Sequence, residues 1–146
     1  MSFAEQVRAD VNAALKASDR ERTGALRLVL SELQKAAKDG ETDELAVLRR
    51  ERKRRLDAAE QFRAGGRPEL AEKEESEAEL IQGYLPAELD DAELQEIVAE
   101  ALAETGVTEP KDMGQVMKAA MGRVQGRADG KRVSAQVREA LEAARA

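Results

Sequence analysis

The amino-acid sequence predicts an all-α protein, in which a larger N-terminal bundle of about four helices is followed by a smaller three-helix tail domain. Three observations support this fold class. Apolar residues recur every three or four positions along most of the chain, which is the spacing of one helix face. Aromatic residues make up only 2% of the 146 residues, and charged residues make up 37%. Glycine, proline and capping residues interrupt the apolar pattern, so each helix is expected to have identifiable ends.

The N-terminal part is expected to contain four helices. Asp19 caps the second, which stops at Asp39–Gly40. Thr42–Asp43 opens the third, Gly65–Gly66 ends it, and Pro68 suits the first turn of the fourth. The side chains expected to face the core are Phe3, Val7, Val11 and Leu15, then Leu26, Val29, Leu30, Leu33 and Ala37, then Leu45, Leu48, Leu56, Ala59 and Phe62, and finally Leu80, Ile81, Tyr84 and Leu85.

Pro86 marks the expected domain boundary, because proline has no backbone N–H and disfavours helix at the preceding residue. An N-terminal helical domain is therefore predicted over residues 1–86 and a C-terminal three-helix domain over residues 87–146. Asp90, Asp112 and Ser134 are the expected caps of the three C-terminal helices. Their expected core positions are Leu94, Ile97, Val98, Ala101 and Leu102, then Met113, Val116, Met117, Ala120, Met121 and Val124, then Val137, Leu141 and Ala144. Methionines four residues apart favour a core position over a ligand-binding face.

Charge is distributed unevenly along the chain. Residues 69–104 contain thirteen acidic residues and one lysine, which disfavours a polyanionic partner there. Residues 111–138 contain seven basic and two acidic residues, a net charge of +5. A second basic run, RRERKRR at residues 49–55, is interpreted as a solvated or internally paired helix surface, with phosphate contact as the alternative.

The sequence contains no histidine and no cysteine. This excludes Ser-His and Cys-His nucleophiles, histidine or cysteine metal sites and disulfides. No catalytic residue, metal or cofactor is predicted, and catalysis by this chain alone is not expected. The N-terminus lacks the apolar core of a secretory leader, and no segment is long enough to span a membrane, so we expect a cytoplasmic protein without a membrane partner.

The stretch GRADGKRVS, residues 126–134, is interpreted first as a corner between two helices and second as an anion contact. It does not match a phosphate-binding loop of the G-x-x-x-x-G-K-[ST] type, because the glycine spacing is one residue short and no serine or threonine follows the lysine. The basic side chains around it remain candidates for a sugar-phosphate backbone. The candidate RNA-binding residues are Lys118, Arg123, Arg127, Lys131 and Arg132.

Several strings in the sequence are familiar: LRLVLSEL, EKEESEAELIQGYLP, MGQVMKAAMGRVQGRADGKRVS and VREAL. In their order and spacing they resemble the YqeY-like family, whose domain also forms the C-terminal helical and tail part of the GatB subunit of glutamine-dependent aminoacyl-tRNA amidotransferases. The resemblance implies an all-α fold and a role in recognising the tRNA body, while the carbon-nitrogen ligase chemistry belongs to other domains and subunits. Lys118 and Arg127 fall within the shared tail motif and are able to donate to phosphate.

Two functions follow from these observations. The first is a non-catalytic accessory module that binds tRNA through the basic tail; no DNA partner is expected. With three aromatic residues in the chain, such binding would use the backbone and shape of the RNA rather than base stacking. The alternative is a protein-interaction module that docks on an amidotransferase or synthetase subunit, through the acidic fourth helix or a methionine-rich face.

Overall fold

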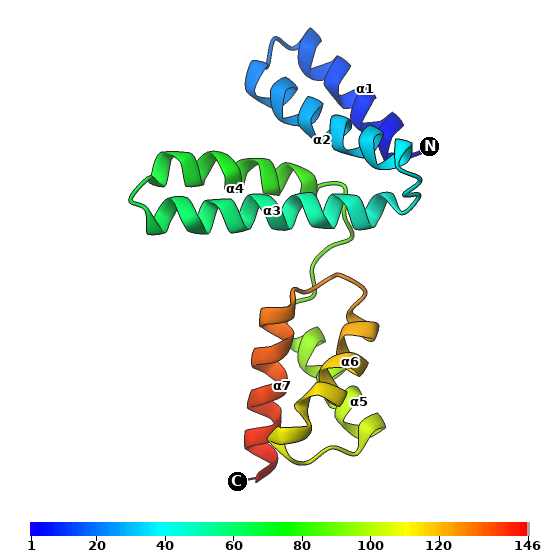
Figure 1. Ribbon diagram of the computed structural model, residues 1–146, viewed down its shortest axis with the longest axis vertical. Coiled ribbons are helices and arrows are strands. Elements are labelled where there is room, and N and C mark those ends of the chain that lie inside the picture. Colours follow the sequence, from blue (N-terminus) through cyan, green and yellow to red (C-terminus); the bar gives the residue numbers. More distant parts are fainter. Residues whose placement is uncertain (146) are drawn as a thin grey trace. The chain divides into compact units, whose positions relative to one another are not determined.

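The computed structural model describes residues 1–145, and within them the chain forms helices and no strands, which confirms the predicted fold class. The elements are α1 (Phe3–Lys16), α2 (Arg20–Lys38), α3 (Glu44–Ala64), α4 (Pro68–Gln82), α5 (Asp91–Thr105), the 3-10 turn η1 (Pro110–Asp112), α6 (Met113–Val124) and α7 (Gly130–Arg145). They divide into two compact units, Met1–Pro86 with α1 to α4 and Ala87–Ala146 with α5 to α7 (Figure 1). None of the helices in the described part of the chain has the length and apolar character needed to cross a bilayer.

The helices of the first unit begin at side-chain caps. Asp19 and Asp43 each accept a hydrogen bond from the backbone N–H three residues later, both at 3.1 Å, as predicted from the sequence. Ser2 and Glu5 form a reciprocal capping box at the start of α1. These caps satisfy backbone donors that have no partner within the helix.

The core of the first unit lies where the antiparallel pair α1 and α2 packs on the N-terminal half of α3 and the end of α4. Its buried side chains are Val7, Val11, Ala14, Leu26, Val29, Leu33, Ala36, Val47, Leu48 and Ile81. The prediction for Leu15 was wrong: it is 48% exposed, and Ala14 takes the core position. Steps of four residues advance about 40° beyond a full turn, so a strict i+4 series drifts off the buried face. Ala36 replaces the predicted Ala37 for a similar reason of register.

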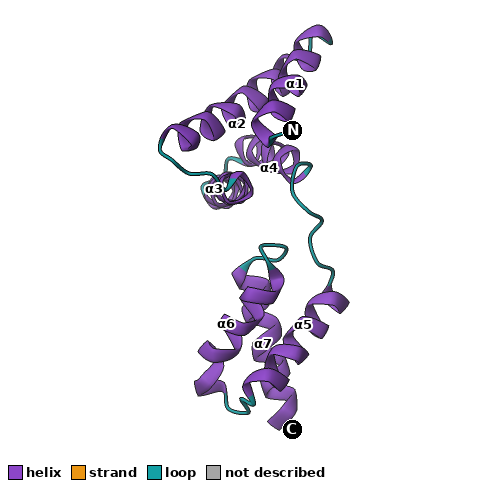
Figure 2. Ribbon diagram, turned by 90° about the vertical axis from the view of Figure 1, so that its right-hand side faces the viewer, coloured by secondary structure: helices purple, strands orange, loops and turns teal. Residues whose placement is uncertain are grey.

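The antiparallel hairpin of α3 and α4 extends beyond the α1–α2 pair (Figure 1), and Figure 2 views it nearly along its axis. In this distal part the buried apolar residues are the alanines Ala59 and Ala71, which allow the two helices to approach closely. Leu56, predicted to be in the core, is 36% exposed. The buried face of α3 instead carries two charged residues, Glu51 and Arg55.

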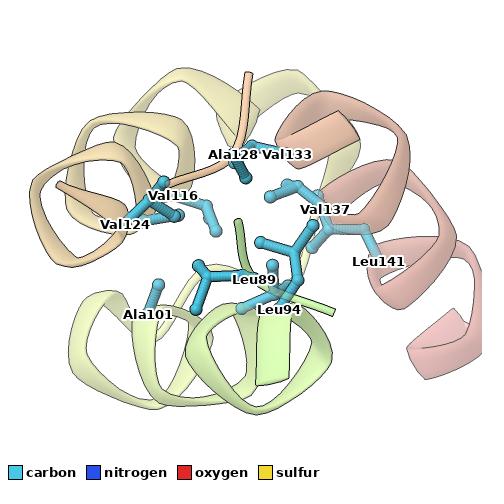
Figure 3. Close-up of a cluster of buried hydrophobic side chains, with 11 residues drawn as sticks. Leu89, Leu94, Ala101, Val116, Val124, Ala128, Val133, Val137 and Leu141 are labelled. Atoms are coloured by element: carbon cyan, nitrogen blue, oxygen red, sulfur yellow. The ribbon is translucent and has the colours of Figure 1, made fainter. Parts of the chain in front are cut away.

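The second unit is a three-helix bundle around one aliphatic core (Figure 3). The buried residues are Leu89, Leu94, Val98, Ala101, Val116, Ala120, Val124, Ala128, Val133, Val137 and Leu141. Met113 and Met117 pack partly against this core, which agrees with the core interpretation of the methionines, whereas Met121 is 39% exposed. One of the three methionines therefore lies at the surface.

Of the three caps predicted for this unit, one formed as expected, one lies at the predicted residue without a side-chain hydrogen bond, and one was wrong. Asp90 opens a capping box for α5 as expected. Asp112 makes no capping hydrogen bond, because it ends the 3-10 turn that leads directly into α6. The last helix begins at Gly130, so Ser134 lies inside it. The cap is Asp129, whose carboxylate accepts from the backbone N–H three residues later at 2.9 Å.

Candidate nucleic-acid interface

The stretch GRADGKRVS forms the corner between α6 and α7, as its first interpretation held. Gln125 and Gly126 have left-handed backbone conformations, with φ of 52° and 76°, and these reverse the chain at the end of α6. Asp129 then caps α7 and occupies one of the free backbone donors at its N-terminus. An anion at this corner would therefore compete with a carboxylate of the chain itself.

Arg127 ties this corner to the beginning of the second unit. Its Nε donates to the carbonyl oxygen of Ala87 at 2.8 Å, and its own carbonyl oxygen accepts from the N–H of Leu89 at 2.8 Å. Its Nη2 lies 4.0 Å from the carboxylate of Glu93. These contacts give Arg127 a structural task, because they hold the segment before α5 against the corner.

Arg123 and Arg132 are also engaged within the unit. The guanidinium of Arg123 contacts the carboxylates of Glu100 at 3.1 Å and Glu104 at 2.7 Å, and the hydrogen bond with Glu104 raises the pKa of Arg123 above its usual value. Arg132 pairs with Asp91 at 3.1 Å. Both arginines thus face acidic residues of α5, and the segregation of charge along the sequence is partly cancelled in space.

The two candidate lysines differ from these arginines in their surroundings. Lys131 is exposed and takes part in an intramolecular polar interaction. Lys118 is exposed on the side of α6 opposite the buried face, and within residues 1–145 its side chain forms neither an ion pair nor a hydrogen bond. The exposed Lys111 and Arg138, on η1 and α7, share this property among the described residues. Both residues lie in the basic segment 111–138, but they were not among the candidate RNA-binding residues predicted from the sequence.

The basic run at residues 49–55 is largely paired internally, in agreement with its first interpretation. Arg50 forms a bidentate pair with Glu41, both bonds at 3.1 Å, and the hydrogen bond raises the pKa of Arg50. Lys53 pairs with Asp57 at 3.1 Å. Three further pairs, Arg54–Glu51, Arg55–Glu51 and Arg55–Glu77, involve the buried face of α3.

The first unit contains an open groove of about 990 Å³ between the N-terminal half of α2 and α4. Leu28, which is 53% exposed, and Leu80 supply apolar surface to it. Arg20 lies on the α2 side, and Glu69 and Glu72 lie on the α4 side. Within the described residues there is no group of acidic side chains placed to hold a metal ion.

Comparison with known proteins shows what this chain is similar to. A family model described as "Yqey-like protein" matches residues 4–141. An uncharacterized protein of Schizosaccharomyces pombe is 36% identical over 78 residues, which is 50% of this chain and 63% of that protein. The protein named "Altered inheritance of mitochondria protein 41, mitochondrial" of Pyrenophora tritici-repentis is 29% identical over 148 residues, covering 94% of this chain and 80% of that protein.

Proposed function

The chain belongs to the YqeY-like family, and we propose that it is a non-catalytic accessory module that binds the sugar-phosphate backbone of tRNA through its second unit. The resemblance to the tail of the amidotransferase subunit supports tRNA as the RNA, and the surface of the unit supports phosphate contacts. A cytoplasmic location is part of this proposal.

One observation carries the proposal. Arg123 and Arg132 pair with acidic residues of α5, but three other cations of the second unit have no intramolecular partner among the described residues. These are Lys111, Lys118 and Arg138, and all three are exposed. The helix α6 contains no acidic residue, so nothing on it repels a phosphate. The arginine pairs have the opposite effect, because binding RNA through Arg123 or Arg132 would first require loss of an existing ion pair.

On both sides of Lys118, the surface of α6 carries a residue without a side chain. Gly114 and Gly122 lie one turn before and after it, and a Cβ added to either would meet nothing within 4 Å. Glycine inside a helix costs about 0.5–1 kcal/mol relative to alanine, and packing within the unit does not require it here. The two glycines support close approach of an external backbone to Lys118.

Fluorescence anisotropy of labelled tRNA, measured over about 50 to 200 mM salt, tests this function. We expect the triple variant Lys111→Gln, Lys118→Gln, Arg138→Gln to bind more weakly and to lower the log-log salt slope by about 2, because each lost phosphate contact removes roughly 0.7–0.9. The matched control is Arg8→Gln, Lys16→Gln, Lys73→Gln, which removes one arginine and two lysines from exposed positions in the first unit. An equal loss of tRNA affinity in the two triple variants, or the absence of saturable tRNA binding by the wild type, would contradict the proposal.

The alternative function, docking on a protein such as an amidotransferase or synthetase subunit, is favoured by the groove between α2 and α4. Its exposed Leu28 offers apolar surface, and its charged sides would orient a partner helix. Leu28→Gln, which removes the apolar side chain without adding a charge, should abolish co-elution with such a subunit and leave tRNA binding unchanged. The methionine-rich face is less suitable, because Met113 and Met117 are half-buried.

The link to carbon-nitrogen ligase chemistry comes from the family resemblance alone. The proposed module would therefore act beside a separate amidotransferase. An assay of glutamine-dependent amidation with the purified protein is expected to show no turnover, and activity that persists through purification would overturn this part of the proposal.

A further inference from the structure

A second basic surface lies on α2, outside the segment that the sequence singled out. Viewed down the helix, its solvent face holds four cations, Arg20, Arg27, Lys35 and Lys38, which we call the α2 cation row. With about 100° of rotation per residue, all four fall within a sector of about 80°. The buried residues of α2, including Val29 and Leu33, lie on the opposite side of the helix.

The α2 cation row is free of intramolecular partners. None of its four side chains forms an ion pair or hydrogen bond within residues 1–145, and all four residues are exposed. The acidic residues of the helix, Glu21 and Glu32, fall outside the sector. Within the described residues, no carboxylate therefore pairs with the charges of this row, in contrast to those of Arg123 and Arg132, although its Arg20 end borders the groove that carries Glu69 and Glu72 of α4.

On this face of α2, small residues lie between the cations. Gly24 and Ser31 lie on the same face, and a Cβ at Gly24 would meet nothing within 4 Å. From Arg20 to Lys38 the row is about 27 Å long at 1.5 Å per residue. A long, narrow row of cations with only small side chains between them matches a linear polyanion better than a compact anion.

We propose that the α2 cation row is a further RNA contact, which binds the phosphate backbone of the same structured RNA as the second unit; this inference rests on the proposed RNA-binding function. An anionic membrane is a poorer partner. A helix that lies on a bilayer must insert an apolar face, and the apolar face of α2 is already packed in the core of the first unit.

The test compares four forms of the full chain by tRNA anisotropy at several salt concentrations. They are the wild type, the α2 variant (Arg27→Gln, Lys35→Gln, Lys38→Gln), the second-unit variant (Lys111→Gln, Lys118→Gln, Arg138→Gln) and the control variant (Arg8→Gln, Lys16→Gln, Lys73→Gln). The α2 variant and the control each remove one arginine and two lysines. We expect the α2 variant to lower the salt slope by about 2 and to weaken binding at ~0.1 M salt by up to about 100-fold, while the control binds like wild type. Circular dichroism should show unchanged helicity, since glutamine, lysine and arginine have similar helix propensities.

The outcomes separate this inference from the function on which it rests. If the second-unit variant binds tRNA more weakly than the wild type and the α2 variant binds it equally well, the α2 contact alone would be overturned. Absence of wild-type binding to tRNA would overturn both. Binding of the α2 row to phosphatidylserine vesicles in place of RNA, lost in the α2 variant, would identify a membrane and also overturn the inference.

Discussion

Replacing Arg55 by alanine should strongly destabilise the first unit, because this guanidinium is buried between carboxylates of two helices. Its side chain is 10% exposed, and Nη1 donates to the side chain of Glu51 at 2.9 Å and to the Glu51 carbonyl oxygen at 3.1 Å. Its Nε lies 3.4 Å from the carboxylate of Glu77 on α4, close enough for an ion pair but without hydrogen-bond geometry. The residue thus joins α3 to α4 mainly by charge.

The magnitude follows from what the substitution leaves behind. Removing one partner of a buried ion pair costs about 3–5 kcal/mol, because the remaining charge stays buried without compensation. Glu51 keeps a second partner, Arg54, at 3.0 Å, so we expect the lower end, about 3 kcal/mol. The matched control is Arg54→Ala: this arginine pairs with the same carboxylate but is 64% exposed, and its loss should cost less than about 1 kcal/mol.

Urea unfolding followed by tyrosine fluorescence measures this difference. The chain has one tyrosine, Tyr84, and no tryptophan, so the signal reports the first unit even if the second unfolds separately. Equal destabilisation by the two substitutions, or a cost below 1 kcal/mol for Arg55→Ala, would refute the argument that burial makes this pair important.

Three further predictions concern single residues. Burial, followed by the hydrogen bond that the Tyr84 hydroxyl donates to Asp10, raises the pKa of Tyr84; phenolate absorbance should therefore titrate above the ordinary value of about 10 in the folded protein and near it in urea. Because the folded pKa is the higher one, this stabilisation is complete below pH ~10 and is lost as pH rises toward the folded pKa, a dependence that Tyr84→Phe should remove. Leu94→Ala, at a fully buried position, should lower the free energy of unfolding of the second unit by about 2–5 kcal/mol in urea melts, and an effect below 1 kcal/mol would contradict its core position. Asp129→Ala should lower the free energy of unfolding by about 1 kcal/mol, because it removes the cap of α7, whereas Asp129→Asn should keep most of the stability that the cap provides. Equal losses for the two variants in thermal melts would argue against the capping role.

The helices were predictable because local signals determine them. The caps at Asp19, Asp43 and Asp90 need only one side chain and the backbone N–H groups of the next turn, and each formed as expected. Asp112 stands at the start of α6 as predicted but makes no capping hydrogen bond, because a 3-10 turn leads into this helix. The prediction for Ser134 failed because Asp129 caps α7 earlier in the chain. Where two capping residues lie close together, as Asp129 and Ser134 do, the sequence alone does not determine which of them starts the helix.

The candidate interface was less predictable, because tertiary contacts decide whether a cation is available. Arg123 and Arg132 appear as free charges in the sequence, but their partners Glu100, Glu104 and Asp91 are 19 to 41 residues away. The spacing of Glu100 and Glu104, one turn apart on α5, was a signal that could have suggested a shared arginine. The face of α2 could have been found from the sequence by separating its exposed cations from its acidic residues.

The distal end of the α3–α4 hairpin has a practical consequence for the architecture. Its buried apolar contacts there are made by alanines, and the turn at Gly65 and Gly66 is exposed and lies away from the core residues around Leu26 and Leu48. Exposed turns with few buried contacts tolerate insertions and are the first sites of proteolytic nicking. This turn is therefore a natural attachment point, where a label or a whole additional domain could be inserted while both helical cores stay intact.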